Sequence, residues 1–285
     1  MTGTVISRAM QLLAVAGGLC LAACQPQGTS VAIATEESGA TMDSWLGKPE
    51  GEGPYPAVVL AHGCSGTERN TPHQTVWRGL NQHAAFLNRN GFVTLILDSF
   101  GPRGITDGCH RPLSYYPVQM RDALDAADFL TTLEFVHEAR IGLVGFSLGG
   151  GTALRLAQQV SVDGRTDADR ATFGAFVAYY PYCDIQFSYA LARPVLVMVG
   201  SEDNWTPAHL CSSFHANAEQ SNPEQVLELV VYPDAHHSFD LPMEGPYHVA
   251  GDFDQRYTVA GNPQARQDSR VRMLEFFRHH LTSAR

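Results

Sequence analysis

The sequence of 285 residues has few long hydrophobic runs and no pair of cysteines in the CxxC spacing. Because only the apolar run at 9–23 approaches the length of a membrane span, no internal transmembrane segment is expected. The missing CxxC pairs, and the lack of a four-ligand pattern of cysteine and histidine, argue against a zinc site. Internal repeats, low-complexity blocks and a central linker are also absent. We therefore expect one compact domain without a metal.

Positive charge is scarce as well. The chain carries 19 Lys and Arg against 29 Asp and Glu, which gives a formal net charge of −10 at pH 7. An acidic surface repels the phosphates of nucleic acids and anionic lipid headgroups. We therefore expect no nucleic-acid partner, and any attachment to a membrane is expected to come from a lipid on the chain.

The N-terminus has the features of an export signal. Arg8 precedes the apolar run 9–23, which is too short to cross a bilayer comfortably and is typical of a secretory signal peptide. The run ends in "LAAC", which resembles the lipobox of bacterial lipoproteins. The resemblance implies that residues 1–23 are removed, that Cys24 is acylated, and that Gln25 after it directs the protein to the outer membrane, facing the periplasm. An ordinary signal peptide, with Cys24 incidental, is the alternative.

Four cysteines lie outside the signal and the lipidation site, at Cys64, Cys109, Cys183 and Cys211. In the oxidising compartment that export implies, four cysteines predict two disulfides with three possible pairings. The sequence leaves the pairing open. The arrangement that we consider joins Cys64 to Cys109 and Cys183 to Cys211.

Strand and helix signals alternate along the chain. Residues 24–45 are polar and rich in small residues and are interpreted as a tether with one early strand, and residues 46–285 as the folded domain. Continuous apolar runs predict buried strands at 57–61, 92–97, 141–146, 173–180, 194–199 and 226–232. Helical character is found at 72–90, 117–134, 148–160, 207–220 and 264–282. The alternation predicts an α/β fold with a mostly parallel, doubly wound sheet flanked by helices, whose ligands bind beyond the carboxyl ends of the strands.

The stretch "GFSLGG" places Ser147 directly between a predicted strand and a predicted helix. A strand that turns into a helix within so few residues needs an unusual backbone, and the neighbouring glycines leave room for it. The turn exposes the serine hydroxyl at the carboxyl edge of the sheet, beside the N–H of Leu148 at the start of a helix. Ser147 is therefore the candidate nucleophile.

A serine hydroxyl needs a base, and the base needs a group that orients it. Asp203 follows one predicted strand, in "GSEDNWTP", and His237 follows the next, in "PDAHHSFD". Both loops lie at the same sheet edge as Ser147, so we predict that Asp203 orients His237 and that His237 accepts the serine proton. His236 is the alternative base, and Asp184, after another strand, is the alternative acid.

A tetrahedral intermediate also needs donors for its oxyanion. The stretch "AHGCSG" follows the first strong strand, so the backbone N–H of Cys64 is predicted to join that of Leu148. His62, in the same stretch, is interpreted as a structural residue. Trp205 and Arg103 are candidate pocket residues, although Trp205 fits packing under a loop equally well and Arg103 fits a salt bridge that fixes its loop.

Five motifs resemble the dienelactone hydrolase family of the α/β-hydrolase superfamily, and in order they are "PYPAVVLAHGCSG", "LILDSFGPRG", "GFSLGG", "GSEDNWTP" and "YPDAHHSFD". The resemblance covers most of the chain from Lys48 onwards and implies the α/β-hydrolase fold with a catalytic triad. The family's histidine commonly precedes a small residue and then phenylalanine, which favours His237 before Ser238 and Phe239. The family's namesake has a cysteine nucleophile, and Ser147 departs from that pattern, which points to a general ester hydrolase.

These features predict an exported serine hydrolase that cleaves small carboxylic esters through an acyl-enzyme and needs no cofactor. Amide, thioester or other acyl-transfer chemistry on the same triad is an alternative. A non-catalytic binding lipoprotein on the same scaffold is the alternative from another class. The sizeable candidate insertions, 103–116 and 240–263, are modest in length and favour an open cleft.

Overall fold

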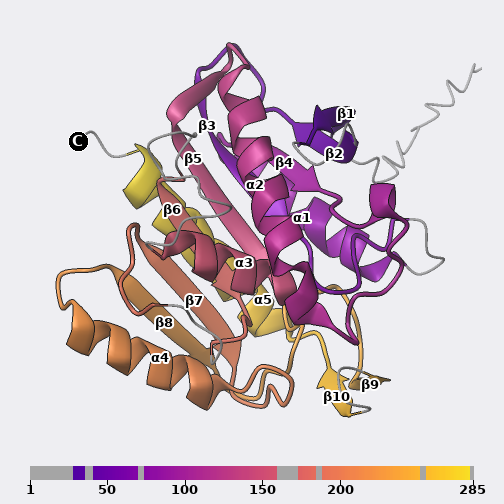
Figure 1. Ribbon diagram of the computed structural model, residues 1–285, viewed down its shortest axis with the longest axis vertical. Coiled ribbons are helices and arrows are strands. Elements are labelled where there is room, and N and C mark those ends of the chain that lie inside the picture. Colours follow the sequence, from indigo (N-terminus) through magenta and orange to yellow (C-terminus); the bar gives the residue numbers. More distant parts are fainter. Residues whose placement is uncertain are drawn as a thin grey trace, which may run out of the picture.

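The computed structural model describes residues 28–35, 41–69, 74–158, 173–183, 188–250 and 255–282. The predicted signal peptide 1–23 and the lipidation site Cys24 lie outside these ranges. Within them, eight strands form the central sheet in the order β1-β2-β4-β3-β5-β6-β7-β8 (Figure 1).

The parallel part of the sheet consists of β3 (Tyr55–Ala61), β4 (Val93–Leu97), β5 (Val136–Phe146), β6 (Ala175–Tyr179), β7 (Val195–Gly200) and β8 (Leu227–Tyr232). Every residue of β4, β6 and β7 is buried, as expected for strands covered on both faces. Each predicted apolar run coincides with one of these strands. The mostly parallel, doubly wound sheet is therefore confirmed.

The N-terminal edge of the sheet differs from the prediction. Within 24–45, which we interpreted as a tether with one early strand, β1 (Thr29–Ala34) forms and β2 (Thr41–Gly47) begins. The two strands pair with each other in antiparallel fashion, and β2 pairs with β4 in the same way. The polar composition of β2 concealed its alternation, in which Met42 and Ser44 are buried while Thr41 and Asp43 are exposed.

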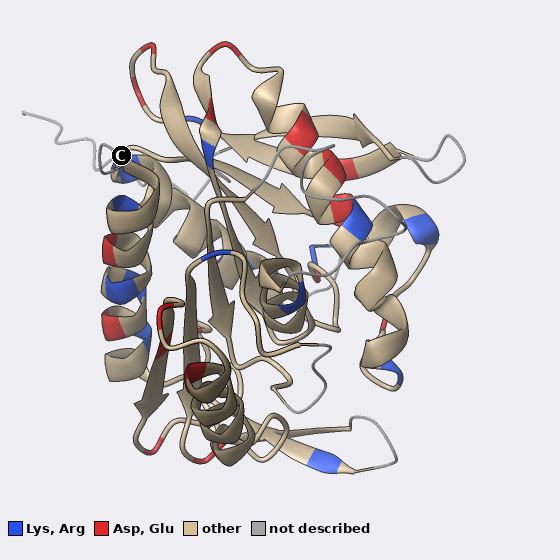
Figure 2. Ribbon diagram, turned by 60° about the vertical axis from the view of Figure 1, so that its left-hand side comes forward, with Lys and Arg blue, Asp and Glu red and all other residues tan. Residues whose placement is uncertain are grey.

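Helices cover both faces of the sheet (Figure 1). Their bounds are α1 (Thr75–Arg89), α2 (Tyr116–Thr131), α3 (Leu148–Ala157), α4 (Ala208–Ser221) and α5 (Pro263–Phe277). In the view of Figure 1, α2, α3 and α4 lie in front of the sheet, with α1 and α5 behind it. Acidic residues gather on α2, whereas α5 carries both signs of charge (Figure 2). No helix in the described part of the chain is long and apolar enough to cross a bilayer.

The strand order changes direction at β3. From β3 the chain runs to β4 on one side, and β5 then pairs with β3 on the other side. In open α/β sheets, the carboxyl ends of strands at such a switch point form the binding crevice. The loops after β3 and β5 contain Cys64 and Ser147, so both candidate residues lie at this position.

The segment predicted as a modest insertion at 240–263 contains a β-hairpin. Its strands are β9 (Tyr247–Ala250) and β10 (Arg256–Val259), which pair with each other in a separate two-stranded sheet, and Val259 also forms an isolated parallel β-bridge with His237. The hairpin packs against the loop after β8, where the N–H of Ala260 donates to the carbonyl of His237 at 3.1 Å. The insertion therefore borders the predicted site.

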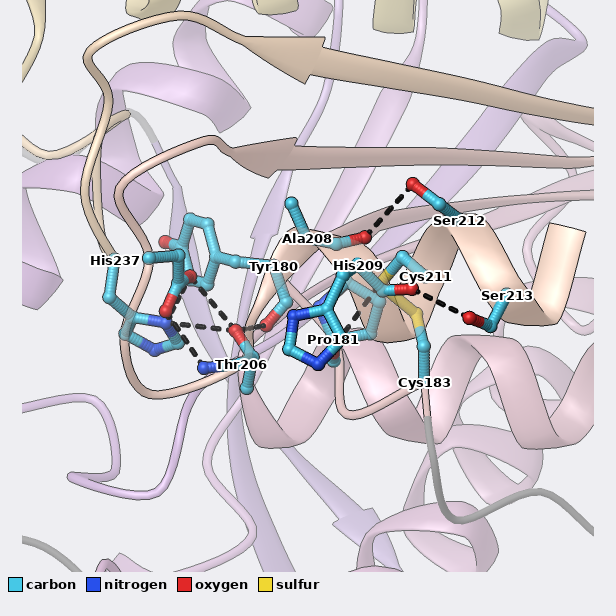
Figure 3. Close-up of a disulfide and its surroundings, with 11 residues drawn as sticks. Tyr180, Pro181, Cys183, Thr206, Ala208, His209, Cys211, Ser212, Ser213 and His237 are labelled. Carbon is cyan, nitrogen blue, oxygen red and sulfur yellow. Dashed lines mark hydrogen bonds and ion pairs between the residues drawn. A yellow bond between two sulfur atoms is a disulfide. The ribbon is translucent and has the colours of Figure 1, made fainter.

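Two disulfides connect loops to their neighbours. Cys64, after β3, is bonded to Cys109 in the loop before α2. Cys183, after β6, is bonded to Cys211 in α4 (Figure 3). This is the arrangement that we considered from the sequence. Such bonds persist in oxidising compartments, so they indicate an oxidising, extracytoplasmic environment.

Removing either disulfide is expected to destabilise the fold, because each bond restricts the unfolded chain. The sequence separations are 45 and 28 residues. The loop-closure model gives about 4 kcal/mol for the longer loop and slightly less for the shorter one. Urea unfolding of the Cys64→Ala/Cys109→Ala and Cys183→Ala/Cys211→Ala double variants measures both losses, each variant serving as the control for the other. A loss below about 1 kcal/mol in both variants would contradict this account.

Candidate active site

Ser147 occupies a sharp turn between β5 and α3. Its backbone has φ 54° and ψ −110°, a conformation that costs a non-glycine residue free energy. The turn is possible because Gly145 and Gly149 are in backbone contact, and a Cβ on Gly145 would collide with the Gly149 carbonyl. The sequence "GFSLGG" therefore produces the predicted geometry, with the hydroxyl at the end of β5.

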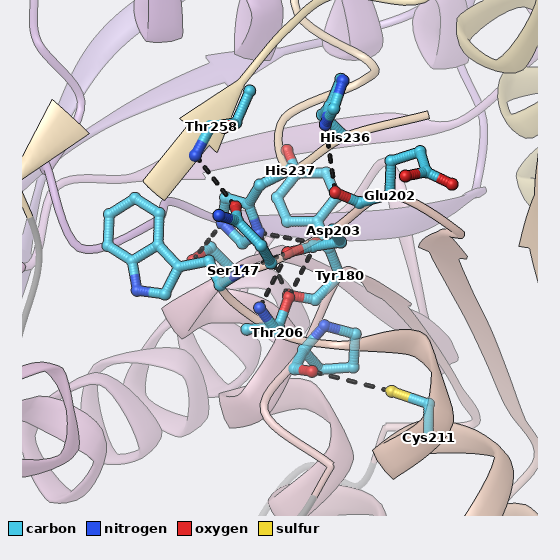
Figure 4. Close-up of polar contacts among 12 residues, drawn as sticks. Ser147, Tyr180, Glu202, Asp203, Thr206, Cys211, His236, His237 and Thr258 are labelled. Atoms are coloured by element: carbon cyan, nitrogen blue, oxygen red, sulfur yellow. Dashed lines mark hydrogen bonds and ion pairs between the residues drawn. The ribbon is translucent and has the colours of Figure 1, made fainter. Parts of the chain in front are cut away.

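The three side chains predicted to act together are within hydrogen-bonding distance (Figure 4). His237 Nε2 lies 3.0 Å from Ser147 Oγ, and His237 Nδ1 lies 2.8 Å from Asp203 Oδ2. The alternative base, His236, instead has its Nδ1 3.0 Å from the carbonyl oxygen of Glu202. All three predicted side chains are buried. The alternative acid, Asp184, lies outside the described residues.

Asp203 is held in one orientation by the turn that follows it. The N–H groups of Trp205 and Thr206 donate to Asp203 Oδ1 at 2.9 and 2.8 Å. The Thr206 hydroxyl lies 2.9 Å from Asp203 Oδ2 and 3.1 Å from His237 Nδ1. These contacts hold the carboxylate with Oδ2 toward the histidine. The sequence analysis missed Thr206, although an Asp followed three residues later by Thr in a loop is a turn signal.

Aromatic rings fix the position of the His237 imidazole. The ring centroids of Tyr180 and Trp205 lie 4.5 and 5.0 Å from that of His237. Trp205 in turn stacks on Tyr257 of β10, with centroids 4.7 Å apart. The hairpin thus supports the histidine through Trp205, and the imidazole has little freedom to rotate.

A buried polar network continues behind Tyr180. Its hydroxyl donates to Asp240 Oδ1, and His83 Nε2 lies 2.9 Å from Asp240 Oδ2. Burial and the negative charge of Asp240 raise the pKa of Tyr180 well above its ordinary value, so the hydroxyl remains a donor. No sequence motif pointed to this network, because its members come from α1, the loop after β6 and the loop after β8.

The two predicted oxyanion donors belong to adjacent loops. The N–H of Leu148 begins α3, and the N–H of Cys64 shares a peptide plane with the carbonyl of Gly63. That carbonyl accepts hydrogen bonds from His62 Nδ1 at 2.7 Å and from the N–H of Gly66 at 3.1 Å, which fixes the plane. Within the described ranges, neither the Cys64 nor the Leu148 N–H donates to a protein acceptor. Both are therefore available to a ligand.

Comparison with known proteins identifies the family. The dienelactone hydrolase family model matches residues 42–281. The chain belongs to the dienelactone hydrolase family. This family of α/β-hydrolases accounts for the sheet order and for the position of Ser147 after β5.

Relatives match along most of their length. A Bradyrhizobium protein named a probable 2-oxo-3-(5-oxofuran-2-ylidene)propanoate lactonase is 24% identical over 263 residues, which is 87% of this chain and 93% of the relative. The solved dienelactone hydrolase of Anabaena variabilis has a TM-score of 0.61 at 21% identity, covering 90% of this chain and 99% of its own. Esterase 2 of Thermogutta terrifontis, solved phosphorylated by paraoxon, has a TM-score of 0.66 at 15% identity, covering 91% and 97%. At these identities the solved structures show a shared fold.

A cleft of about 890 Å³ opens above Ser147 in this family member. Its lining includes Ser147, His237 and Trp205, so the structure places Trp205 beside the candidate nucleophile as predicted. Strand residues of the hairpin, including Tyr247 and Val259, form part of the wall. Among the residues that the structure describes, no group of His, Cys, Asp and Glu side chains is arranged to hold a metal ion.

Arg103 does not line the cleft, and its prediction as a pocket residue is wrong. Its guanidinium forms two hydrogen bonds of 2.9 Å with the carboxylate of Asp122 in α2, and a third with the carbonyl of Ser99 at 2.8 Å. The side chain therefore fixes the loop after β4. Asp98, in the same loop, accepts from the N–H groups of Phe100 and Gly101.

His62 and His83 are fully buried. The N–H of Ser99 donates to His62 Nε2 at 3.1 Å, so Nδ1 carries the proton and His62 is a structural residue. Burial lowers the pKa of His62, although the negative charges of Asp98 and Asp122 act to raise it. Burial likewise lowers the pKa of His83, which faces Asp240, Arg270 and Arg266.

These lowered pKa values predict that the folded protein loses stability in mild acid. An unfolded histidine titrates near pH 6.5, so between about pH 7 and 5 the unfolded chain binds protons that the folded chain excludes. Each buried histidine adds a slope of up to about 1.4 kcal/mol per pH unit, stability falling as pH falls. Urea unfolding at pH 7, 6 and 5 is expected to give a shallower slope for His83→Gln than for the unaltered protein. His209→Gln, at an exposed position, is the control, and equal slopes in all three proteins would refute the prediction.

Proposed function

We propose that this protein is an exported serine hydrolase that cleaves carboxylic esters through an acyl-enzyme. The observation that carries the proposal is the position of the His237 ring, with Nε2 3.0 Å from Ser147 Oγ and Nδ1 2.8 Å from Asp203. A histidine hydrogen-bonded on both sides in this way can remove the proton of a serine while a carboxylate stabilises the resulting imidazolium.

In the first half-reaction, Ser147 Oγ attacks the ester carbonyl and its proton passes to His237 Nε2. The carbonyl oxygen becomes an oxyanion that accepts hydrogen bonds from the N–H groups of Cys64 and Leu148. The intermediate collapses when the C–O bond to the alcohol breaks. His237 gives its proton to the departing alkoxide, which leaves as the alcohol, and the acyl group remains on Ser147.

In the second half-reaction, water replaces the alcohol. His237 takes a proton from the water, whose oxygen attacks the acyl carbon, and the oxyanion forms again at the same donors. The bond to Ser147 Oγ then breaks, and the proton on His237 restores the serine hydroxyl while the acid departs. Asp203 keeps its charge throughout and holds Nδ1–H in place. No step calls for a cofactor.

The test of this function is the loss of turnover when each member of the triad is replaced. Ser147→Ala, His237→Ala and Asp203→Asn are each expected to reduce kcat for 4-nitrophenyl butyrate by roughly 10⁴-fold or more, because the serine is then absent or lacks its oriented base. His236→Ala is the matched control, since this neighbouring side chain bonds the Glu202 carbonyl, and it should retain most of the activity.

Covalent labelling separates catalysis from binding on an inactive scaffold. Paraoxon is expected to phosphorylate Ser147 in the unaltered protein, and a fluorophosphonate to phosphonylate it, whereas Ser147→Ala should remain unlabelled by both, as read by intact-protein mass spectrometry. Wild-type turnover by Ser147→Ala would refute the mechanism. A folded wild-type sample that takes up no label would favour the binding lipoprotein. Faster cleavage of amides or thioesters than of matched esters would favour the other acyl-transfer chemistries.

We further propose that the protein is anchored in the outer membrane, facing the periplasm, through a lipid on Cys24, after removal of residues 1–23. The "LAAC" stretch and the two disulfides support export. Cells grown with a radioactive fatty acid are expected to label the wild-type protein and not Cys24→Ala. Equal labelling of both proteins, or of neither, would refute the anchor while leaving the hydrolase unaffected.

A further inference from the structure

Beside the triad, the inner wall of the cleft carries many apolar side chains. The buried or half-buried residues that line it include Leu80, Phe146, Trp205, Leu241, Met243 and Val259. A charged substrate group that entered this region would lose its water and gain no ionic partner. The inner cleft is therefore suited to uncharged parts of a substrate.

Asp240 adds a negative charge to this wall. It lines the cleft although its side chain is only 1% exposed, and its two oxygens are occupied by the Tyr180 hydroxyl and His83. Tyr180, which Asp240 binds, packs directly against His237. A substrate anion at the nucleophile would thus lie near a fixed carboxylate, in surroundings of low dielectric where repulsion is strong.

The rim of the cleft is also acidic. Glu68, Asp107 and Glu244 line it, and Arg78 is the single Lys or Arg among the described lining residues. Arg78, Asp107 and Glu244 are exposed, whereas Glu68 is half-buried. The whole chain has the same sign, with a net charge of −10. A cleft lined mainly by one sign of charge attracts substrates of the opposite sign and repels those of its own.

We infer that this cleft selects uncharged or cationic esters and discriminates against esters that carry a carboxylate. The inference rests on the proposed esterase function and names the substrate class for the same site. The rim and the inner wall of the cleft contribute in different ways. The acidic rim slows the approach of an anion, and the apolar inner wall with Asp240 disfavours its binding beside Ser147.

The test compares esters of equal length that differ in charge. The probes are 4-nitrophenyl esters of methyl adipate, which is neutral, of adipate, which carries a terminal carboxylate, and of 5-(trimethylammonio)pentanoate, which is cationic. At low salt and pH 8, kcat/KM for the anionic ester is expected to be about 100-fold below that of the neutral ester, with the cationic ester equal to or above it. The deficit should narrow in 0.5 M NaCl, because salt screens the rim charges.

Charge-reversal variants assign the effect to the cleft. Glu244→Lys combined with Asp107→Lys is expected to raise the ratio of anionic to neutral kcat/KM by about tenfold at low salt. Glu134→Lys combined with Glu138→Lys is the matched control, because both residues are exposed near the amino end of β5, at the opposite edge of the sheet from Ser147. It changes net charge by the same amount and should leave the ratio unaltered.

Each other outcome has a definite meaning. Equal or faster turnover of the anionic ester refutes the inference and leaves the esterase intact. A selective loss of anionic turnover in Arg78→Gln also refutes it, because Arg78 would then be a carboxylate receptor. Equal effects of the Glu134→Lys/Glu138→Lys control and the rim variant would assign selectivity to net charge and refute a role of the cleft. If the protein hydrolyses none of the three esters, the proposed function is refuted and the inference with it.

Discussion

The close packing of α3 against the carboxyl ends of β3 and β5 is the constraint on which the site depends. A Cβ on Gly149 would collide with the backbone carbonyl of Ala61, and one on Gly145 would collide with Gly149 itself. Because both positions are glycine, the N–H of Gly149 can donate to the carbonyl of His62 at 3.1 Å. This contact joins the start of α3 to the loop after β3. The nucleophile and its two proposed oxyanion donors therefore belong to one rigid unit, which needs little reorganisation during a reaction.

The histidine side of the site is built from three consecutive loops at the same sheet edge. Tyr180 follows β6, Thr206 follows β7, and His237 follows β8. The Thr206 hydroxyl lies 3.1 Å from the Tyr180 carbonyl and 3.1 Å from His237 Nδ1, so it connects all three loops. Tyr180 has a positive φ of 38°, a strained conformation that such contacts maintain. The strained backbone of Tyr180 thus lies beside the His237 imidazole that it helps to hold, and the neighbouring strands of the sheet keep this loop rigid.

The sequence was sufficient for the parts of the site that depend on topology. Ser147, Asp203 and His237 each follow a strand of a parallel sheet, and such strands end at a common edge, so their convergence could be predicted without coordinates. Side-chain contacts that form only when distant elements pack together could not be predicted in this way. Nothing in the sequence near Arg103 indicates that Asp122 would neutralise it, and nothing near Asp240 indicates His83. These contacts join positions that are distant along the chain and carry no local spacing signal.

The strands of the fold also differ in how well the sequence predicts them. Continuous apolar runs identified the buried strands because both faces of those strands meet the core. The strand β2, which lies next to the edge strand β1, has polar residues that conceal its alternation, with Ser44 fully buried in spite of its hydroxyl. The strands of the hairpin, β9 and β10, are only four residues long, and β9 is mostly exposed while β10 buries Tyr257 and Val259, so the apolar signal in the sequence is short. Sequence periodicity therefore predicts the buried strands of the central sheet well, and it predicts strands that are partly exposed, such as those of the hairpin beside the cleft, poorly.

The two disulfides strengthen the loops that the sheet does not order. Cys64 provides a proposed oxyanion donor through its backbone, while its side chain is bonded to Cys109, and both residues line the cleft. The N–H of Gly108 also donates to the carbonyl of Cys64 at 2.8 Å, so the two loops are joined twice. The second disulfide ties the loop after β6, which contains Tyr180, to α4. An oxidising compartment thus stabilises the two loops on which the oxyanion donors and the His237 support depend, so that the site is most rigid where the disulfides can persist.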